Sequence, residues 1–331
     1  MKKTGFIIVL FLLGISLGIV VDRYLIQRFQ QVSTGVVGDD VHQVRQGGYS
    51  LINPLLECEI GERTLSKQFT SFRYRLEDEV KRLEADSQIE NVSVYFRNLN
   101  NGVGIGVNEK ENFSPASLLK IPVMIAYYKQ YEIDPAFFKK KLIYNDPVDR
   151  NEGETVRPRL SMVPDEEYSI DDLIYRMIVF SDNNAMGLLV RNLPLATQDK
   201  VFTDLGITIP GVRGTEDYMS VLDNASFFRI LFNASYLEKE TSQKVLELLT
   251  KVSFSDGIRG GVPKGVPIAN KFGERVFNGM QQLHDCGIVY FKDNPYLLCV
   301  MSRGSDFKKL SSSIRQISRI VYSEVKKQEQ P

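Results

Sequence analysis

The stretch at residues 112–128, NFSPASLLKIPVMIAYY, places the strongest constraint on what this chain can fold into. A polar turn with a proline leads directly into a long apolar run, and this pattern predicts a buried helix. Ser114 suits the capping position and Pro115 suits the first helical turn. Pro122 removes one helical hydrogen bond, so we expect the helix to bend or restart nearby.

Ser117 and Lys120 are the first residues in this stretch that could carry chemistry. Positions three apart lie on one face of a helix, so the hydroxyl and the amine can meet. A serine needs a base to become a nucleophile, and a lysine can serve when burial or positive neighbours lower its pKa. Ser-x-x-Lys also begins at Ser305 and at Ser323. The motif alone therefore favours the simpler interpretation, a serine in the opening turn of a core helix.

Composition indicates a folded globular protein and excludes several function classes. The 331 residues are 43% apolar and 25% charged, which suits one large domain or two modest ones. Lysines plus arginines equal aspartates plus glutamates at 41 each, so net charge predicts no nucleic-acid partner. The two histidines and three cysteines do not cluster at metal-ligand spacing, so we expect neither a metal nor a cofactor.

The N-terminus predicts the location of the protein. Two lysines precede an apolar run over residues 5–21, whose length is near that of a membrane-spanning helix. No cleavage site is obvious after the run, so we interpret residues 1–26 as an uncleaved, single-pass signal-anchor. The lysines favour an extracytoplasmic position for the rest of the chain. There, Cys58 could pair with Cys286 or Cys299, and the sequence does not decide between them.

Residues 27–52 are polar and glycine-rich, which predicts a juxtamembrane linker before one folded domain over residues 53–331. Periodicity predicts helices at residues 65–85, from Ser117 onward, and at 170–193, 220–232, 239–251 and 308–327. It predicts strands at residues 91–98, 103–107, 268–272, 286–290 and 296–301. Strands at both ends with helices between them predict one sheet with a helical region inserted in the middle.

Ser181-Asp182-Asn183 interrupts an otherwise apolar predicted helix. Three polar groups in this position need partners or a cavity. They can be interpreted as a helix break with local capping. They can also be interpreted as a cleft wall, in which Ser181 moves protons and Asn183 contacts Lys120 and a substrate.

Lys271-Phe272-Gly273 ends a predicted strand. A lysine there would lower the pKa of the first lysine and attract a carboxylate. The glycine would let the strand backbone approach a substrate closely.

Ser-x-x-Lys, Ser-Asp-Asn and Lys-x-Gly, in this order, are the three signature elements of the penicillin-recognising serine hydrolases. From about residue 53 to its end, the chain resembles the class A β-lactamase-like members of that superfamily. The resemblance implies their α/β (α+β) fold, an antiparallel sheet flanked by helices with an inserted all-helical subdomain. It also implies an enzyme that cleaves a β-lactam or a peptidoglycan-like amide through an acyl-serine intermediate.

The resemblance also assigns roles to individual residues. Ser117 would be the acylated nucleophile, Lys120 its general base, and Ser181 the group that passes a proton to the leaving nitrogen. The substrate contacts would come from four further residues: Asn183, Lys271, Gly273 and Arg275. The oxyanion hole would consist of two backbone N–H groups, that of Ser117 and one just after Gly273, near Arg275.

Phe272 departs from the family pattern, because the family has a threonine or serine there whose hydroxyl binds the substrate carboxylate. An apolar ring cannot make that hydrogen bond. His284 lies close to where class A enzymes place a basic residue facing the pocket, so it could bind a substrate anion instead. It could equally be a histidine at the entrance of a strand.

A second departure concerns hydrolysis of the acyl-serine. Class A β-lactamases carry Glu-x-x-Leu-Asn on a loop after Ser-Asp-Asn, and its glutamate activates the deacylating water. That loop is shorter here, so we expect an acyl-enzyme that forms but hydrolyses slowly. Two alternatives stay open. The chain could be a true β-lactamase with a displaced deacylating group such as Glu216, or a catalytically weak module that binds peptidoglycan or protein.

Overall fold

The computed structural model describes residues 41–45, 48–60, 67–209, 211 and 216–328. The predicted signal-anchor lies outside these ranges. Contacts divide the chain into two units, and the larger one, residues 43–58 and 67–331, contains the sheet and the site described below. Among the described residues, no helix combines the length and the apolar character needed to cross a membrane.

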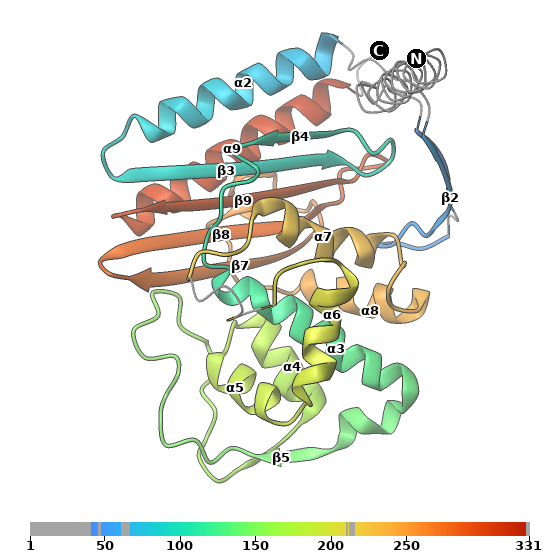
Figure 1. Cartoon of the computed structure of the whole chain (residues 1–331), viewed down its shortest axis with the longest axis vertical. Coiled ribbons are helices and arrows are strands. Elements are labelled where there is room, and N and C mark those ends of the chain that lie inside the picture. Colours follow the sequence, from blue (N-terminus) through green and yellow to red (C-terminus); the bar gives the residue numbers. More distant parts are fainter. Residues whose placement is uncertain (1–40, 46–47, 61–66, 210, 212–215, 329–331) are drawn as a thin grey trace, which may run out of the picture. The chain divides into compact units, whose positions relative to one another are not determined.

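A five-stranded antiparallel sheet forms the centre of this unit (Figure 1). Its strands are β3 (Ile89–Asn98), β4 (Gly104–Val107), β7 (Ile268–Phe277), β8 (Met280–Val289) and β9 (Tyr296–Gly304). Their spatial order is β4-β3-β9-β8-β7, so strands from the two ends of the domain pair at β3 and β9. This confirms the predicted fold class and the predicted pairing of the two ends.

Helices pack around the sheet, and most of them lie between β4 and β7 in the sequence. They are α2 (Lys67–Glu84), α3 (Lys120–Ile133), α4 (Ile170–Val179), α5 (Asn183–Arg191), α6 (Leu195–Asp204), α7 (Val221–Phe232), α8 (Lys239–Leu249) and α9 (Phe307–Gln328). Three 3₁₀ turns, η1 (Ala116–Leu119), η2 (Pro135–Lys139) and η3 (Ile258–Gly261), and the short strand pair β5 (Lys141–Ile143) and β6 (Glu167–Ser169) connect them. In Figure 1, α3 to α6 form the inserted helical region next to the β7 edge of the sheet.

Side chains alternate between the two faces of the sheet, and this alternation decides which residues can reach the site. On β7, Lys271 and Gly273 share one face, and Gly273 approaches η1 there. Phe272 is buried; its ring stacks on Phe254 with centroids 4.3 Å apart, and the Lys271 Nζ lies 4.2 Å from the ring centroid. The strand therefore brings Lys271 and Gly273 to the helical region and packs the ring between Phe254 and the lysine amine.

The strand carrying this motif is longer than the sequence pattern predicted. β7 continues to Phe277, and a two-residue turn at Asn278-Gly279 leads into β8. Both turn residues have positive φ, 52° and 78°, as the type I′ hairpin turn requires. Asn-Gly is a strong signal for this turn, and it was the feature that could have placed the end of the strand.

The predicted linker is partly folded. Strand β1 (Val41–Arg45) pairs with β2 (Leu55–Ile60), and Ile52 is buried. The Asn53 N–H donates to the carbonyl oxygen of Phe232 at 2.8 Å, which fastens this segment to the end of α7.

The single helix predicted at residues 170–193 is wrong, because the chain breaks between α4 and α5. Ser181 lies in the break with φ +58°, a left-handed conformation that interrupts helical hydrogen bonding. Asp182 then caps α5, and its Oδ1 accepts from the N–H groups of Asn184 at 2.8 Å and Ala185 at 3.3 Å. The helix-break interpretation of this motif is confirmed.

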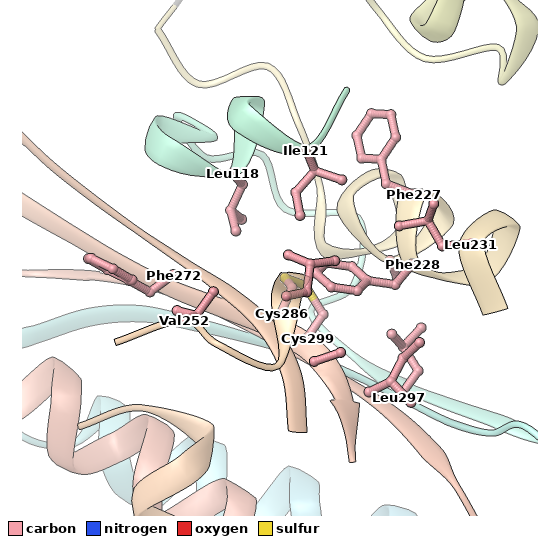
Figure 2. Packing of buried hydrophobic residues seen from close by; sticks show 14 of the residues in the cluster. Leu118, Ile121, Phe227, Phe228, Leu231, Val252, Phe272, Cys286, Leu297 and Cys299 are labelled. Atoms are coloured by element: carbon pink, nitrogen blue, oxygen red, sulfur yellow. A yellow bond between two sulfur atoms is a disulfide. The ribbon is translucent and has the colours of Figure 1, made fainter. Parts of the chain in front are cut away.

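A disulfide joins Cys286 of β8 to Cys299 of β9, at directly paired positions of the two strands. The two pairings considered from the sequence, Cys58 with Cys286 or with Cys299, are therefore wrong. Figure 2 shows Leu118, Ile121 and Phe228 extending toward this part of the sheet. All three side chains are buried, so the packing fixes η1 and the start of α3 on the sheet.

Candidate active site

Ser117 lies in η1, and the regular α-helix α3 starts three residues later at Lys120. Pro122 falls in the first turn of α3, where its missing N–H costs no helical hydrogen bond. The predicted restart of the helix near Pro122 is confirmed. Ala116 has φ +49°, a strained conformation for a residue with a side chain, directly before the serine.

The predicted capping role of Ser114 is wrong. Pro115 occupies the cap of η1, and no side chain caps that turn. The backbone N–H of Ser114 instead donates to Gln282 Oε1 at 3.0 Å, which ties the approach to η1 to strand β8.

Lys120 is fully buried and lies at the centre of the site. Its Nζ is 2.8 Å from Ser117 Oγ, 2.6 Å from Asn183 Oδ1, and 2.6 Å and 3.0 Å from the carbonyl oxygen and Oγ of Ser181. An ammonium has three protons to donate, so it cannot serve four acceptors fully. A neutral amine can instead accept the Ser117 hydroxyl proton.

Burial is what lowers the pKa of Lys120 to about 7, against the opposing effect of the Glu154, Asp182 and Glu274 carboxylates. The expected effect of the second lysine on the first is not found. Instead, Lys120 affects Lys271. Burial has the largest effect on the pKa of Lys271, the positive charge of Lys120 adds to it, and together they lower that pKa well below its ordinary value.

Lys271 is also fully buried, and its Nζ lies 2.9 Å from Ser181 Oγ. It donates to the Phe272 carbonyl oxygen at 2.8 Å. Because Lys120 Nζ lies 3.0 Å from the same Oγ, the Ser181 hydroxyl is held between two amines. The three sequence motifs therefore meet at one point, as their order along the chain predicted.

Gly273 lies where strand β7 passes η1. A methyl group on Gly273 would lie 3.0 Å from the Ser117 nitrogen and 3.2 Å from the Leu118 nitrogen, so only glycine permits this approach without a shift. Arg275, two residues further, lies at the rim of the same cavity and pairs with Glu216, with both N–O distances 3.2 Å.

The structure keeps Phe272 and His284 out of the cavity. The His284 side chain is completely buried; its Nε2 lies 2.8 Å from the Ser114 carbonyl oxygen, and its Nδ1 is 3.3 Å from the Ser302 nitrogen. Burial lowers the pKa of His284 to about 4. The prediction that His284 binds a substrate anion is therefore wrong, because the ring is neutral, enclosed and engaged by backbone groups.

A cavity of about 710 Å³ opens over Ser117. Asn183, Glu154, Glu274 and Arg275 line it together with the serine. Sequence reasoning missed both Glu154 and Glu274. The first lies in the irregular segment before α4, which carries no motif, and the second directly follows Lys271-Phe272-Gly273, where its position beside the motif was a usable signal.

Glu154 and Glu274 form a carboxyl pair beside the lysine. Asn183 Nδ2 donates to Glu154 Oε1 at 2.8 Å, and the Glu154 carboxyl is also hydrogen-bonded to that of Glu274. Burial, followed by the charge of Glu274, raises the pKa of Glu154 to about 7. The site thus combines a hydroxyl, two amines of lowered pKa and a carboxyl of raised pKa. These groups suit proton transfer near neutral pH.

Residues 75–325 match the model of the beta-lactamase enzyme family. In structure the chain is similar to PBP-A, with 22% identity and a TM-score of 0.64 over 78% of this chain and 97% of that one. A mutant of PBP-A, 21% identical with a TM-score of 0.64 over 78% of this chain and 97% of that one, is an acyl-enzyme complex with penicillin G. A β-lactamase from Sphaerobacter thermophilus is 21% identical, with a TM-score of 0.64 over 76% of this chain and 96% of that one.

No curated protein matches the sequence. The structural similarities establish the fold, and they agree with the resemblance that the three motifs indicated. The family match extends over most of the described domain and includes Ser117, Lys120, Ser181 and Lys271. The chain therefore belongs to the beta-lactamase enzyme family and is a class A β-lactamase-like serine acyl-transferase or hydrolase.

Proposed function

We propose that this protein is a membrane-anchored, extracytoplasmic serine enzyme that cleaves a β-lactam or a peptidoglycan-like amide through an acyl-serine. The observation that carries the proposal is the 2.8 Å approach of the buried Lys120 Nζ to Ser117 Oγ. The family match and the penicillin G acyl-enzyme of a PBP-A mutant support the substrate class.

In the proposed acylation, neutral Lys120 takes the proton of Ser117 Oγ, which attacks the amide carbonyl carbon. The oxyanion is stabilised by the N–H of Ser117 and by a backbone N–H of β7 just after Gly273. As the C–N bond breaks, Ser181 gives its hydroxyl proton to the leaving nitrogen. Lys120 replaces that proton across the 3.0 Å separation from Ser181 Oγ.

The remaining predicted site residues bind or position the substrate. Asn183 contacts the substrate amide from the wall opposite the strand. Lys271 fixes the Ser181 hydroxyl and adds positive potential beneath it. Arg275, whose side chain is 43% exposed at the rim, is the group we assign to a substrate carboxylate, because the family hydroxyl is replaced by a ring that faces the core.

The proposed location rests on two observations. The Cys286–Cys299 disulfide is typical of proteins outside the reducing cytoplasm. Two lysines followed by the apolar run at residues 5–21 favour an anchor with the catalytic domain outside.

Labelling of the full-length protein in detergent with a fluorescent penicillin tests the proposal. We expect a covalent label that survives denaturation on the wild-type chain and disappears in Ser117→Ala. Ser305→Ala is the matched control, because Ser305 begins another Ser-x-x-Lys and should leave labelling unchanged. A label that persists in Ser117→Ala would contradict the nucleophile assignment. An unlabelled wild type that also leaves the penicillin intact would favour the binding module.

A further inference from the structure

The segment at residues 149–156 is fixed against the Ser-Asp-Asn motif by side-chain hydrogen bonds. Asn151 Nδ2 donates to Asp182 Oδ1 at 2.9 Å, and the Asn183 N–H donates to Asn151 Oδ1 at 2.8 Å. Asn184 Nδ2 donates to Asp149 Oδ1 at 2.9 Å. A segment without regular structure is therefore held at a defined position beside the nucleophile.

Glu154 extends from this segment toward Lys120 through one intervening side chain. The Asn183 amide receives a hydrogen bond from Lys120 Nζ at its Oδ1, 2.6 Å away, and donates from its Nδ2 to Glu154 Oε1 at 2.8 Å. Ser117 and Glu154 line the same cavity. The Glu154 carboxyl and the nucleophile therefore open onto the same space, and the inference below places the attacking water there.

Glu274 holds the Glu154 segment from the strand side. Its Oε1 accepts from the Val156 N–H at 2.7 Å and its Oε2 from the Thr155 N–H at 3.2 Å, and the side chain is buried. These two hydrogen bonds fix the Glu274 carboxyl beside the segment that carries Glu154. The neighbouring negative charge helps to raise the pKa of Glu154 to about 7, a value suited to a general base at neutral pH.

Glu216, the residue first considered for this task, is placed differently. Its carboxylate is engaged with Arg275 at two distances of 3.2 Å, and its side chain is 44% exposed. The two glutamates on the cavity wall therefore differ in their contacts. Glu154 is linked to Lys120 through the Asn183 amide, whereas Glu216 is held at the exposed rim by Arg275.

We infer that Glu154 activates the water that hydrolyses the acyl-serine, and that Glu274 positions it. This inference rests on the acyl-serine function proposed above. It assigns the deacylating role to a segment before the Ser-Asp-Asn motif, whereas the family places that role on a loop after it. It also replaces the expectation of slow hydrolysis with an expectation of turnover.

The proposed step transfers one water proton to Glu154 and then to Ser117. A water proton moves to the Glu154 carboxylate as the water oxygen bonds to the acyl carbonyl carbon. The C–Oγ bond then breaks with its electron pair on Oγ. Because acylation left Lys120 neutral, the proton held by Glu154 passes through solvent to Oγ. The products are a carboxylic acid and free Ser117, and Glu154 is again a carboxylate.

A pulse–chase experiment on the full-length protein separates formation of the acyl-serine from its hydrolysis. The protein is labelled with fluorescent penicillin, excess reagent is removed, and loss of label is followed on denaturing gels. We expect Glu154→Gln to be labelled as readily as wild type but to lose its label about 100-fold more slowly, as loss of a general base predicts. Glu152→Gln, an exposed position in the same segment, is the matched control and should behave as wild type.

The pH dependence distinguishes a chemical role from a structural one. Wild-type loss of label should slow as pH falls through about 7, where Glu154 becomes protonated, and Glu154→Gln should lack this dependence. Glu274→Gln should move the wild-type midpoint to lower pH, because it removes the neighbouring negative charge.

Equal rates of label loss in Glu154→Gln and wild type would overturn the inference and leave the acyl-serine function standing. A larger slowing in Glu216→Gln than in Glu154→Gln would also overturn it, and so would a wild-type label that persists for hours. Absence of label on both wild type and Glu154→Gln would refute the proposed function itself, and the inference with it.

Discussion

The cavity wall that carries Ser117 and the wall that carries Glu154 are built in different ways. The first joins η1, α3, the break after α4 and strand β7, and its two lysines are fully buried. The second is an irregular segment at residues 149–156, fixed by hydrogen bonds that Asn side chains and backbone N–H groups donate to Asp and Glu carboxylates. Hydrophobic packing sets the first wall, and a polar network sets the second.

This difference separates the two halves of the proposed reaction. Groups on the packed wall form the acyl-serine, whereas Glu154 on the polar wall is assigned to its hydrolysis. Changes in the packed wall should therefore alter stability or acylation. Changes in the polar network should alter loss of label while labelling itself continues.

Lys120→Met should have the largest effect on the packed wall. It removes the proposed base while keeping an apolar stem of similar length, so we expect acylation to fall about 1,000-fold. In the wild type, acylation should rise with pH through about 7, because the amine must be neutral to take the Ser117 proton. Labelling rates from pH 5.5 to about pH 8.5 measure both effects.

Lys129→Met, on the exposed side of the same helix, is the matched control for this substitution. It should keep both the labelling rate and its pH dependence. A Lys120→Met protein that acylates like wild type would show that another group is the base.

Phe272→Thr tests whether restoring the family hydroxyl restores carboxylate binding. The ring is 1% exposed and stacks on Phe254, so its loss should leave a core cavity and destabilise the fold by about 3 kcal/mol or more. Because this side chain is buried and does not line the cavity, we expect no gain in acylation. Denaturant unfolding and labelling rates check the two statements.

Phe272→Leu, which keeps most of the apolar volume, should cost only about 1 kcal/mol. Faster labelling of Phe272→Thr at unchanged stability would contradict the assignment of this side chain to the core.

Asn151→Ala should have a smaller effect, confined to the polar wall. The Asn151 side chain is buried and bridges Asp182 and the Asn183 N–H, so its loss should cost about 1–3 kcal/mol. Loosening of the segment should slow the loss of label more than the labelling step. Thermal unfolding together with pulse–chase measures both, and the exposed Thr155→Ala is the control.

The sequence motifs predicted the packed wall because each belongs to a regular element with a recognisable pattern. Ser117 and Lys120 lie three apart at a helix start, and β7 brings Lys271 to them across the sheet. The break at Ser181 was only one of two interpretations of its motif, and the predicted helix ran through it because apolar residues continue on both sides. The left-handed φ of Ser181 places the break.

Glu154 and His284 show where sequence patterns stop being informative. Glu154 lies in an irregular segment whose position depends on long-range hydrogen bonds to Asn183 and Glu274, which no local pattern encodes. His284 was expected in the cavity because of its place before a strand. Because the hairpin is longer than predicted, His284 lies in the middle of β8. Its side chain is buried against the residues that precede η1, where Nε2 contacts the Ser114 carbonyl oxygen.

The most direct test of the account is peptide mapping by mass spectrometry of Glu154→Gln after incubation with penicillin G at neutral pH. We expect one penicillin per chain, on the peptide that contains Ser117, and persistence of this adduct after wild-type protein has lost its own. An adduct on another residue would contradict Ser117 as the nucleophile. An adduct on Ser117 that disappears as fast as in wild type would contradict the role of Glu154.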